Sequence, residues 1–276
     1  MKAVIPAAGF GTRFLPIAKA VPKELLPVGD KPVIHHVVAE AAAAGFDEIL
    51  IIISTGKESI LRYFEPDSAL EAHLEKTGRH EALAAVREAS SLARISSIYQ
   101  PEMRGLGDAV RLARDFVGAD DAFAVLLGDT IVHGESPLPT MRDAWDALKT
   151  GSVAIESCPP DRVSRYGVAG GHELRPGIFQ LDALVEKPSP DEVPALFDRN
   201  GDPIPPHAFA ARYLFPRVIF DHLDATSPGH GGEIQLTDAM ETLRRDAGLL
   251  GIRLHGRRLD IGNPAGLLAA AQILSS

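Results

Sequence analysis

Cysteine, basic charge and long apolar runs are all scarce in this chain of 276 residues. Cys158 is the single cysteine, so no disulfide can form within the chain, and this composition suits a reducing cytoplasm. The net charge of −9 disfavours nucleic acid and anionic membranes as partners, because both need a basic surface. No stretch approaches the roughly 18 apolar residues of a membrane span, and the first apolar run is too short for a signal-peptide core. We therefore expect a cytoplasmic protein that binds any anionic ligand at a local cationic site.

Internal repeats and low-complexity linkers are also absent, and the length predicts one large domain, 1–276. In the first half, 1–150, strand and helix patterns alternate. Strands are predicted at 3–6, 48–54, 94–99 and 122–127, and helices at 31–44, 57–64, 67–92 and 106–116. This alternation predicts an α/β fold with a Rossmann-like, mixed but mainly parallel sheet and helices on both faces. Ligands of such sheets bind beyond the carboxyl ends of the strands.

The pattern loosens in the second half, 151–276. Strands are predicted at 152–156, 179–185, 208–214 and 251–255, and helices at 216–223, 233–245 and 264–274. The proline-rich segment 191–206 is predicted to be an exposed excursion. We expect this half to extend the same sheet.

Glycines followed by cations end the first predicted strand, in IPAAGFGTRFLPIAKAVPKELLP (5–27). Gly9 and Gly11 fit the start of a dinucleotide-binding fingerprint, but Phe14 stands where its third glycine belongs. The spacing of a P-loop is absent as well. The alternatives left are a turn before a solvated basic face, and a loop that wraps a nucleoside triphosphate with backbone N–H groups. The second needs nearby cations, which Arg13 and Lys23 supply.

The stretch G-x-G-T-R-x-L-P-x-x-K-x-x-P-K-E resembles the signature of the sugar-phosphate nucleotidyltransferases. Further blocks of the same family follow in collinear order at 25–32, 105–110, 128–129, 165–168, 185–188, 232–239 and 260–264. The resemblance therefore covers nearly the whole chain. It implies a glycosyltransferase-A-like fold in which 1–150 binds the nucleotide, while 151–276 binds the sugar and adds a C-terminal helix. Ala18 and Gly128 depart from the pattern, where a threonine and, in uridylyl-transferring members, a proline are usual.

This resemblance implies a reaction between a nucleoside triphosphate and a sugar 1-phosphate, with Mg²⁺ as cofactor and a homodimer or homotetramer as the assembly. Pro22-Lys23-Glu24 and the 232–239 block favour UTP and glucose 1-phosphate, which give UDP-glucose and pyrophosphate. Leu-Gly-Asp at 127–129 is more typical of relatives that use dTTP. The alternative outside the enzymes is a sensor that binds a nucleotide sugar without reacting. A protein that only binds has less need of all the charged site residues, Arg13, Lys23, Asp129, Lys187 and Asp260.

The resemblance also assigns roles to residues. Catalytic roles fall to Arg13 on the leaving pyrophosphate, to Lys23 on the reacting phosphates and to Lys187 on the sugar's phosphate; Lys19 could equally be a surface residue. The implied contacts are Ala8, Gly9, Gly11, Thr12, Gln100, Gly105 and Asp129 for the nucleotide, Gly167, Glu186, Lys187 and Tyr213 for the sugar, and Asp129 and Asp260 for the metal. Plain structural roles compete with some of these, such as an exposed loop glutamine for Gln100, a half-buried strand residue for Tyr213 and a turn for Asp260.

Overall fold

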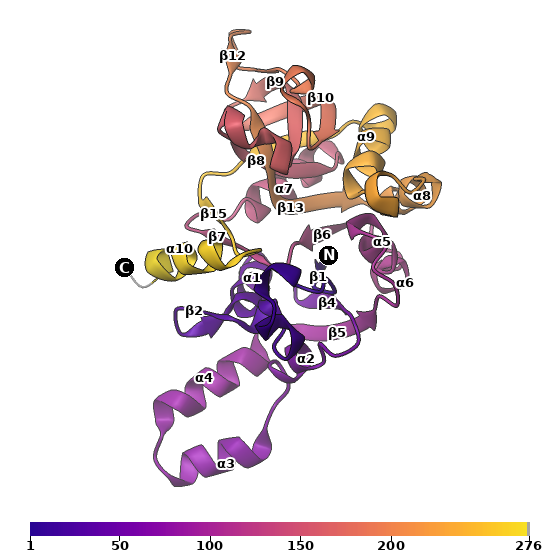
Figure 1. The fold of residues 1–276 in the computed structure, drawn as a ribbon. Helices are drawn as coiled ribbons and strands as arrows, with labels where there is room; N and C mark the ends of the chain where they lie inside the picture. The colour runs from indigo at the N-terminus through magenta and orange to yellow at the C-terminus, as the bar shows by residue number, and fades with distance from the viewer. Residues whose placement is uncertain (275–276) are drawn as a thin grey trace.

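A long mixed sheet runs through the computed structural model, which describes residues 1–274 (Figure 1). Within these residues the sheet has eleven strands in the order β12-β11-β9-β10-β14-β8-β13-β6-β1-β4-β5. The first half of the chain supplies β1 (Lys2–Pro6), β4 (Glu48–Ile53), β5 (Arg94–Tyr99) and β6 (Ala122–Leu126). The second half supplies β8 (Ser152–Ser157), β9 (Gly167–Arg175), β10 (Ile178–Glu186), β11 (Leu196–Phe197), β12 (Pro203–Ile204), β13 (His207–Pro216) and β14 (Leu250–Arg253). Two ribbons lie outside it, β2 (Pro27–Val28) with β3 (Lys31–Pro32) and β7 (Thr130–His133) with β15 (Arg257–Asp260).

Strand direction changes along this sheet. The β6-β1-β4-β5 run is parallel, as expected from the alternating pattern of 1–150. In the second half only β14–β8 and β11–β9 are parallel, and the remaining neighbours are antiparallel. The expectation of a mainly parallel sheet is therefore correct for the first half and wrong for the second. The two halves join where β13 runs antiparallel to β6.

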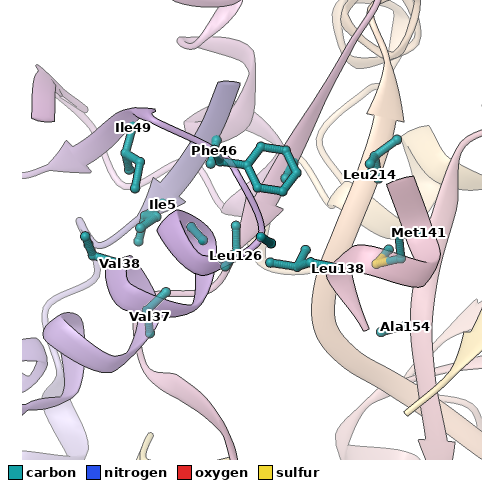
Figure 2. Packing of buried hydrophobic residues seen from close by; sticks show 14 of the residues in the cluster. Ile5, Val37, Val38, Phe46, Ile49, Leu126, Leu138, Met141, Ala154 and Leu214 are labelled. Atoms are coloured by element: carbon teal, nitrogen blue, oxygen red, sulfur yellow. The ribbon is translucent and has the colours of Figure 1, made fainter. Parts of the chain in front are cut away.

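Helices cover both faces because side chains alternate along the strands. Ile5, Ile49 and Leu126 point to the face that carries α1 (Val33–Ala43), α2 (Ser59–Arg62) and α7 (Leu138–Leu148), as Figure 2 shows for the packing around Phe46 and Met141. Alternate residues pack under the helices of the other face, α5 (Leu106–Arg111), α6 (Arg114–Val117), α8 (Ile219–Ala225) and α9 (Leu236–Ala247). A smaller cluster seats α10 (Pro264–Leu274) against β2 and the β7–β15 ribbon.

Several predicted elements need correction. Residues 67–92 form two helices, α3 (Ser68–Lys76) and α4 (His80–Ser91), because Gly78 adopts φ +70° between them; the pair projects from the body (Figure 1). The excursion at 191–206 contains the short strands β11 and β12, and Leu196 is buried. Sequence analysis missed β7, β9, β15 and α7, although Leu138, Met141 and Trp145 have helical spacing. None of the helices within 1–274 is long and apolar enough to cross a bilayer.

A buried ion pair fastens α1 to β13 behind the carboxyl edge of the sheet. The Arg212 side chain is fully buried and donates to both carboxylate oxygens of Glu40 at 2.6–3.1 Å. It also donates to the carbonyl of Thr130 at 2.8 Å. Ala211 has φ +60° at a register shift in β13 that separates Phe209 from Tyr213. Arg212 therefore holds the backbone directly after Asp129.

Replacing Arg212 by methionine should lower the free energy of unfolding by about 3–5 kcal/mol, because Glu40 would keep a buried charge without its partner. Urea denaturation followed by circular dichroism measures the loss. Arg94→Met is the matched control: its pair with Glu48 lies on the surface, with side chains 73% and 43% exposed, and its loss should cost less than about 1 kcal/mol. Equal losses in the two variants would contradict this account of Arg212.

Candidate functional site

Two adjoining cavities open at the carboxyl edge of the sheet. The first, of about 400 Å³, lies beyond β1 and beside α5. The second, of about 240 Å³, lies between the end of β6 and strands of the second half. Leu106, Leu127 and Asp129 line both cavities. Groups bound in the two cavities would therefore meet at Asp129.

The first cavity gathers the residues that the resemblance assigns to a nucleotide. Its lining includes Ala8, Gly9, Gly11, Thr12, Gln100, Gly105 and Asp129, and Lys23 lies beside them. Gly11 takes φ +64°, which glycine adopts without strain, and the chain turns there into a short helix at Thr12–Phe14. Gly128 brings the end of β6 close to this loop, since a Cβ there would be 3.1 Å from the Pro6 carbonyl.

Two buried side chains, Ser54 and Lys57, hydrogen-bond to backbone carbonyls of the glycine loop. Ser54 donates to the carbonyl of Ala8 at 2.8 Å. Lys57 donates to the carbonyl of Ala7 at 2.6 Å and to both oxygens of Glu24 at 2.8 and 3.0 Å. Burial lowers the pKa of Lys57 and raises the pKa of Glu24, while each partner partly offsets the shift of the other. Sequence analysis missed Lys57, because a lysine that begins a predicted helix gives no sign of being buried.

Lys23 pairs with Asp129 at the junction of the cavities. Its Nζ lies 2.6 Å from Oδ2 of Asp129. Burial alone would lower the pKa of Lys23, but the carboxylates of Asp129 and Glu24 outweigh it and raise that pKa. Burial likewise acts to raise the pKa of Asp129, and Lys23 reverses this to a net lowering. Both side chains are therefore charged at neutral pH.

The wall opposite the glycine loop is built from α5 and the segment before α9. Gln100 is buried, and its amide donates to Asp108 at 2.9 Å and to the Gly105 carbonyl at 3.2 Å. It is therefore not an exposed loop glutamine. A Cβ on Gly105 would lie 2.8 Å from the Ile234 carbonyl, and one on Gly107 would meet the same atom at 2.8 Å. Both glycines thus permit close packing of 233–234.

The second cavity gathers the predicted sugar residues Gly167, Glu186 and Tyr213. Thr237 donates to Oε2 of Glu186 at 2.7 Å and so fixes the orientation of this carboxylate. Tyr213 is buried and stacks on Phe215; burial, followed by the charge of Glu186, raises its pKa. The phenol is therefore neutral and keeps its O–H for hydrogen bonding.

Lys187 stands apart from the other predicted sugar residues. It lines neither cavity; its side chain is 55% exposed, and its Nζ lies 3.7 Å from Glu186. Its φ of +47° is unusual for a residue with a side chain. The backbone directly after β10 is therefore in the left-handed region. The catalytic role of Lys187 stays a prediction.

Arg13, Asp129 and Asp260 converge near Gly262. A Cβ placed on Gly262 would lie 3.0 Å from Oδ1 of Asp260, 3.2 Å from Nη1 of Arg13 and 3.8 Å from Oδ2 of Asp129. Arg13 lines the second cavity rather than the first and donates to the Gly262 carbonyl at 3.4 Å. Asp260 is the last residue of β15, directly before the bend at Gly262, and its Oδ1 accepts a hydrogen bond from the Gly262 N–H at 2.9 Å.

These two aspartates fit the donor set for a hard divalent cation. Mg²⁺ takes one or two protein carboxylates and fills its remaining positions with phosphate oxygens and water. No group of three or more His, Cys, Asp or Glu side chains within 1–274 could hold a metal without such help. Asp129 and Asp260 could therefore hold Mg²⁺ together with a bound phosphate chain.

Sequence analysis missed several other residues that line the second cavity, among them Arg165, Tyr166, Gln235, Thr237 and Arg258. The first four of these belong to blocks that carry the resemblance, so a residue-by-residue reading of those blocks could have found them. Arg258 lies on the unpredicted β15 and had no such signal.

The amino-acid sequence matches the family described as nucleotidyl transferase over residues 2–276. This chain belongs to that family. The nucleotidyl transferase is 42% identical to UTP–glucose-1-phosphate uridylyltransferase YngB of Bacillus subtilis, over 98% of this chain and 88% of the relative. It is 38% identical to the UTP–glucose-1-phosphate uridylyltransferase of Pseudomonas aeruginosa, over 98% of this chain and 94% of that one.

Solved structures agree with the predicted fold of this nucleotidyl transferase. A UDP-glucose pyrophosphorylase complexed with UDP-glucose superposes with a TM-score of 0.87 at 32% identity, over 99% and 98% of the two chains. The UTP-bound enzyme of Acinetobacter baumannii also gives 0.87, at 33% identity over 99% and 92%. A thymidylyltransferase structure from Bacillus anthracis reaches 0.74 at 24% identity over 99% and 94%, which shows the shared fold alone. The α/β nucleotidyltransferase fold is thereby confirmed.

Substituting Gly105 by alanine should weaken binding of a nucleoside triphosphate by at least about tenfold, because the new Cβ would displace the 233–234 wall and strain the φ of +98°. Isothermal calorimetry measures the affinity. Gly78→Ala is the control, since Gly78 also has positive φ but a Cβ there meets nothing within 4 Å. Unchanged affinity in a folded Gly105→Ala variant would contradict this packing argument.

Proposed function

We propose that this chain transfers the uridylyl group of UTP to glucose 1-phosphate, giving UDP-glucose and pyrophosphate. The observation that carries the proposal is the meeting of two cavities at Asp129, one lined by the glycine loop and the other by Glu186 and Tyr213. Relatives that match nearly the whole chain are named for this reaction, and solved relatives hold UTP or UDP-glucose.

Positioning and charge stabilisation carry the chemistry. A phosphate-monoester oxygen of glucose 1-phosphate attacks the α-phosphorus of UTP. Its second pKa of about 6 leaves it ionised at neutral pH, so no general base is needed. The chain must instead bring two polyanions together and stabilise the charge that develops between them.

Lys23 and Arg13 supply that charge in the proposed mechanism. Asp129, which lines both cavities, holds the ammonium of Lys23 at 2.6 Å. With the phosphates in place, Lys23 exchanges the carboxylate for oxygens around the α-phosphorus. Arg13, beside Asp260 and Gly262, binds the leaving pyrophosphate. Asp129 and Asp260 would hold Mg²⁺, which when bound supplies positive charge to the phosphate oxygens.

The sugar is recognised in the second cavity. Because Thr237 occupies Oε2 of Glu186, the other carboxylate oxygen is oriented to accept hydrogen bonds from sugar hydroxyls. Gly167 has no side chain, which lets the Phe209 ring and this carboxylate pack directly against its backbone; a Cβ there would lie 3.0 Å from Oε2 of Glu186 and would clash with the ring. Tyr213 offers a neutral O–H on the same wall. We keep Lys187 as a second cation for the sugar's phosphate; its side chain is 55% exposed and lines neither cavity, so it would have to reach inward when that phosphate binds.

Further parts of the proposal rest on the family resemblance. We propose that residues 1–150 bind the nucleotide and 151–276 the sugar, although Glu233 also lines the first cavity and Arg13 the second. The enzyme acts as a homodimer or homotetramer in the cytoplasm, and its single cysteine suits that compartment. Sedimentation velocity would determine the assembly.

A substrate panel tests the reaction. Purified protein with Mg²⁺ and glucose 1-phosphate should release pyrophosphate fastest with UTP, more slowly with dTTP, and not at all without a sugar phosphate. Faster turnover with dTTP would favour the thymidylyl reaction. Binding of UDP-glucose without any pyrophosphate release would show a non-catalytic sensor instead.

Lys23→Ala should lower turnover about 10²–10³-fold, the usual cost of losing one charge-stabilising donor in phosphate and oxyanion chemistry. Lys19→Ala is the matched control: Lys19 is exposed, lines neither cavity and makes no ion pair within 1–274. It should retain nearly full turnover. A folded Lys23→Ala protein with wild-type turnover would refute the proposed role of Lys23.

A further inference from the structure

Arg258 is a nearly buried cation whose donors are mostly unused. Its side chain is 11% exposed, and its Nε donates to Glu156. Its guanidinium lies over the Tyr166 ring, 4.3 Å from the centroid. Neither of its NH₂ groups has a hydrogen-bond acceptor within 1–274, yet Arg258 lines the second cavity.

A guanidinium held in this way can bind an anion without first being reoriented. Glu156 and Tyr166 fix the side chain on two sides, so little rotamer freedom is left to lose when a ligand binds. The unused NH₂ donors are accessible from the second cavity, so a bound anion can accept hydrogen bonds from them. Their planar arrangement matches two oxygens of a phosphate.

The place of Arg258 on β15 indicates which phosphate it would meet. Successive side chains of a strand alternate, so Arg258 and Asp260 point to the same side, and both line the second cavity. Asp260 marks the end of this cavity where Arg13 and Asp129 converge. Tyr166 contacts the Arg258 guanidinium, and the next residue, Gly167, lies beside the Glu186 carboxylate. Arg258 therefore lies between the reacting phosphates and the sugar hydroxyl acceptors.

Other cations are less well placed for this task. Lys187 is 55% exposed and lines neither cavity. Arg165 lines the second cavity but is exposed, and Arg13 belongs to the Asp260 end. Among the described residues that line this cavity, Arg258 is the cation that combines burial with free donors.

We propose that Arg258 binds the phosphate of the hexose 1-phosphate and holds its attacking oxygen toward the α-phosphorus. The inference rests on the proposed uridylyl transfer and adds a substrate contact that the sequence blocks did not assign. Arg258 in this role distinguishes a phosphorylated sugar from a free sugar, because a neutral hexose leaves its donors unpaired.

Steady-state kinetics of Arg258→Gln and Arg258→Lys test the proposal, with each substrate varied at saturating levels of the other. Arg257→Gln is the matched control, since Arg257 is the neighbouring arginine, points to the other side of β15 and is exposed. In R258Q the KM for glucose 1-phosphate should rise roughly 30-fold while the KM for UTP changes less than about twofold. R258K should be intermediate, and R257Q should match the wild type.

Thermal denaturation verifies folding of each variant. If R258Q alone fails to fold because Glu156 is left unpaired, the double variant E156Q/R258Q removes both charges and takes its place. A KM for glucose 1-phosphate within about threefold of wild type in the folded variants would overturn the inference. A parallel rise of both KM values would do the same, because it would mark Arg258 as structural. Wild-type protein that releases no pyrophosphate would instead overturn the proposed function.

Discussion

Lys23 lies between two carboxylates, and only one of them holds it. Glu24, its neighbour in sequence, is directed inward and bound at both oxygens by buried Lys57. Asp129 is left as the partner of Lys23 at the junction of the two cavities. Since Lys57 also holds the Ala7 carbonyl, one buried ammonium both shapes the glycine loop and binds the second carboxylate, whose charge still helps to raise the pKa of Lys23. The two cavities adjoin at this Lys23–Asp129 pair.

Mixed strand direction is what brings the second wall to this edge. Parallel strands β1, β4 and β6 all end on the glycine-loop side, which places Asp129 beside the loop. The antiparallel neighbour β13 passes the same edge in the opposite direction and presents Ala211 and Tyr213 to the second cavity. A sheet parallel throughout would have required a crossover helix there. The change of direction thus allows sugar and nucleotide walls to adjoin.

The first half of the fold could be predicted from sequence because β1, β4 and β6 are buried apolar runs and glycines follow α1, α3 and α6. The Gly9–Gly11 loop followed from that pattern, and the family resemblance added Asp129. The second half was harder, because β9 contains polar and glycine residues and β15 reads as Arg-Arg-Leu-Asp, which resembles a surface turn. The contacts of Lys57 and Arg258 join segments 33 and 102 residues apart, and no local pattern shows them. The opening signature and the seven blocks that follow it did mark most of the cavity lining.

The register shift in β13 fixes how many residues the chain must have between Phe209 and Tyr213. Directly after Ala211 the side chains alternate, with Arg212 toward α1 and Tyr213 toward the second cavity. Deleting or inserting one residue there would exchange the two sides, exposing an arginine to the sugar wall and burying a tyrosine beside Glu40. The α3–α4 arm contacts chiefly itself, so its length can drift between relatives. Insertions in this family should therefore accumulate in the arm and be excluded from 209–213.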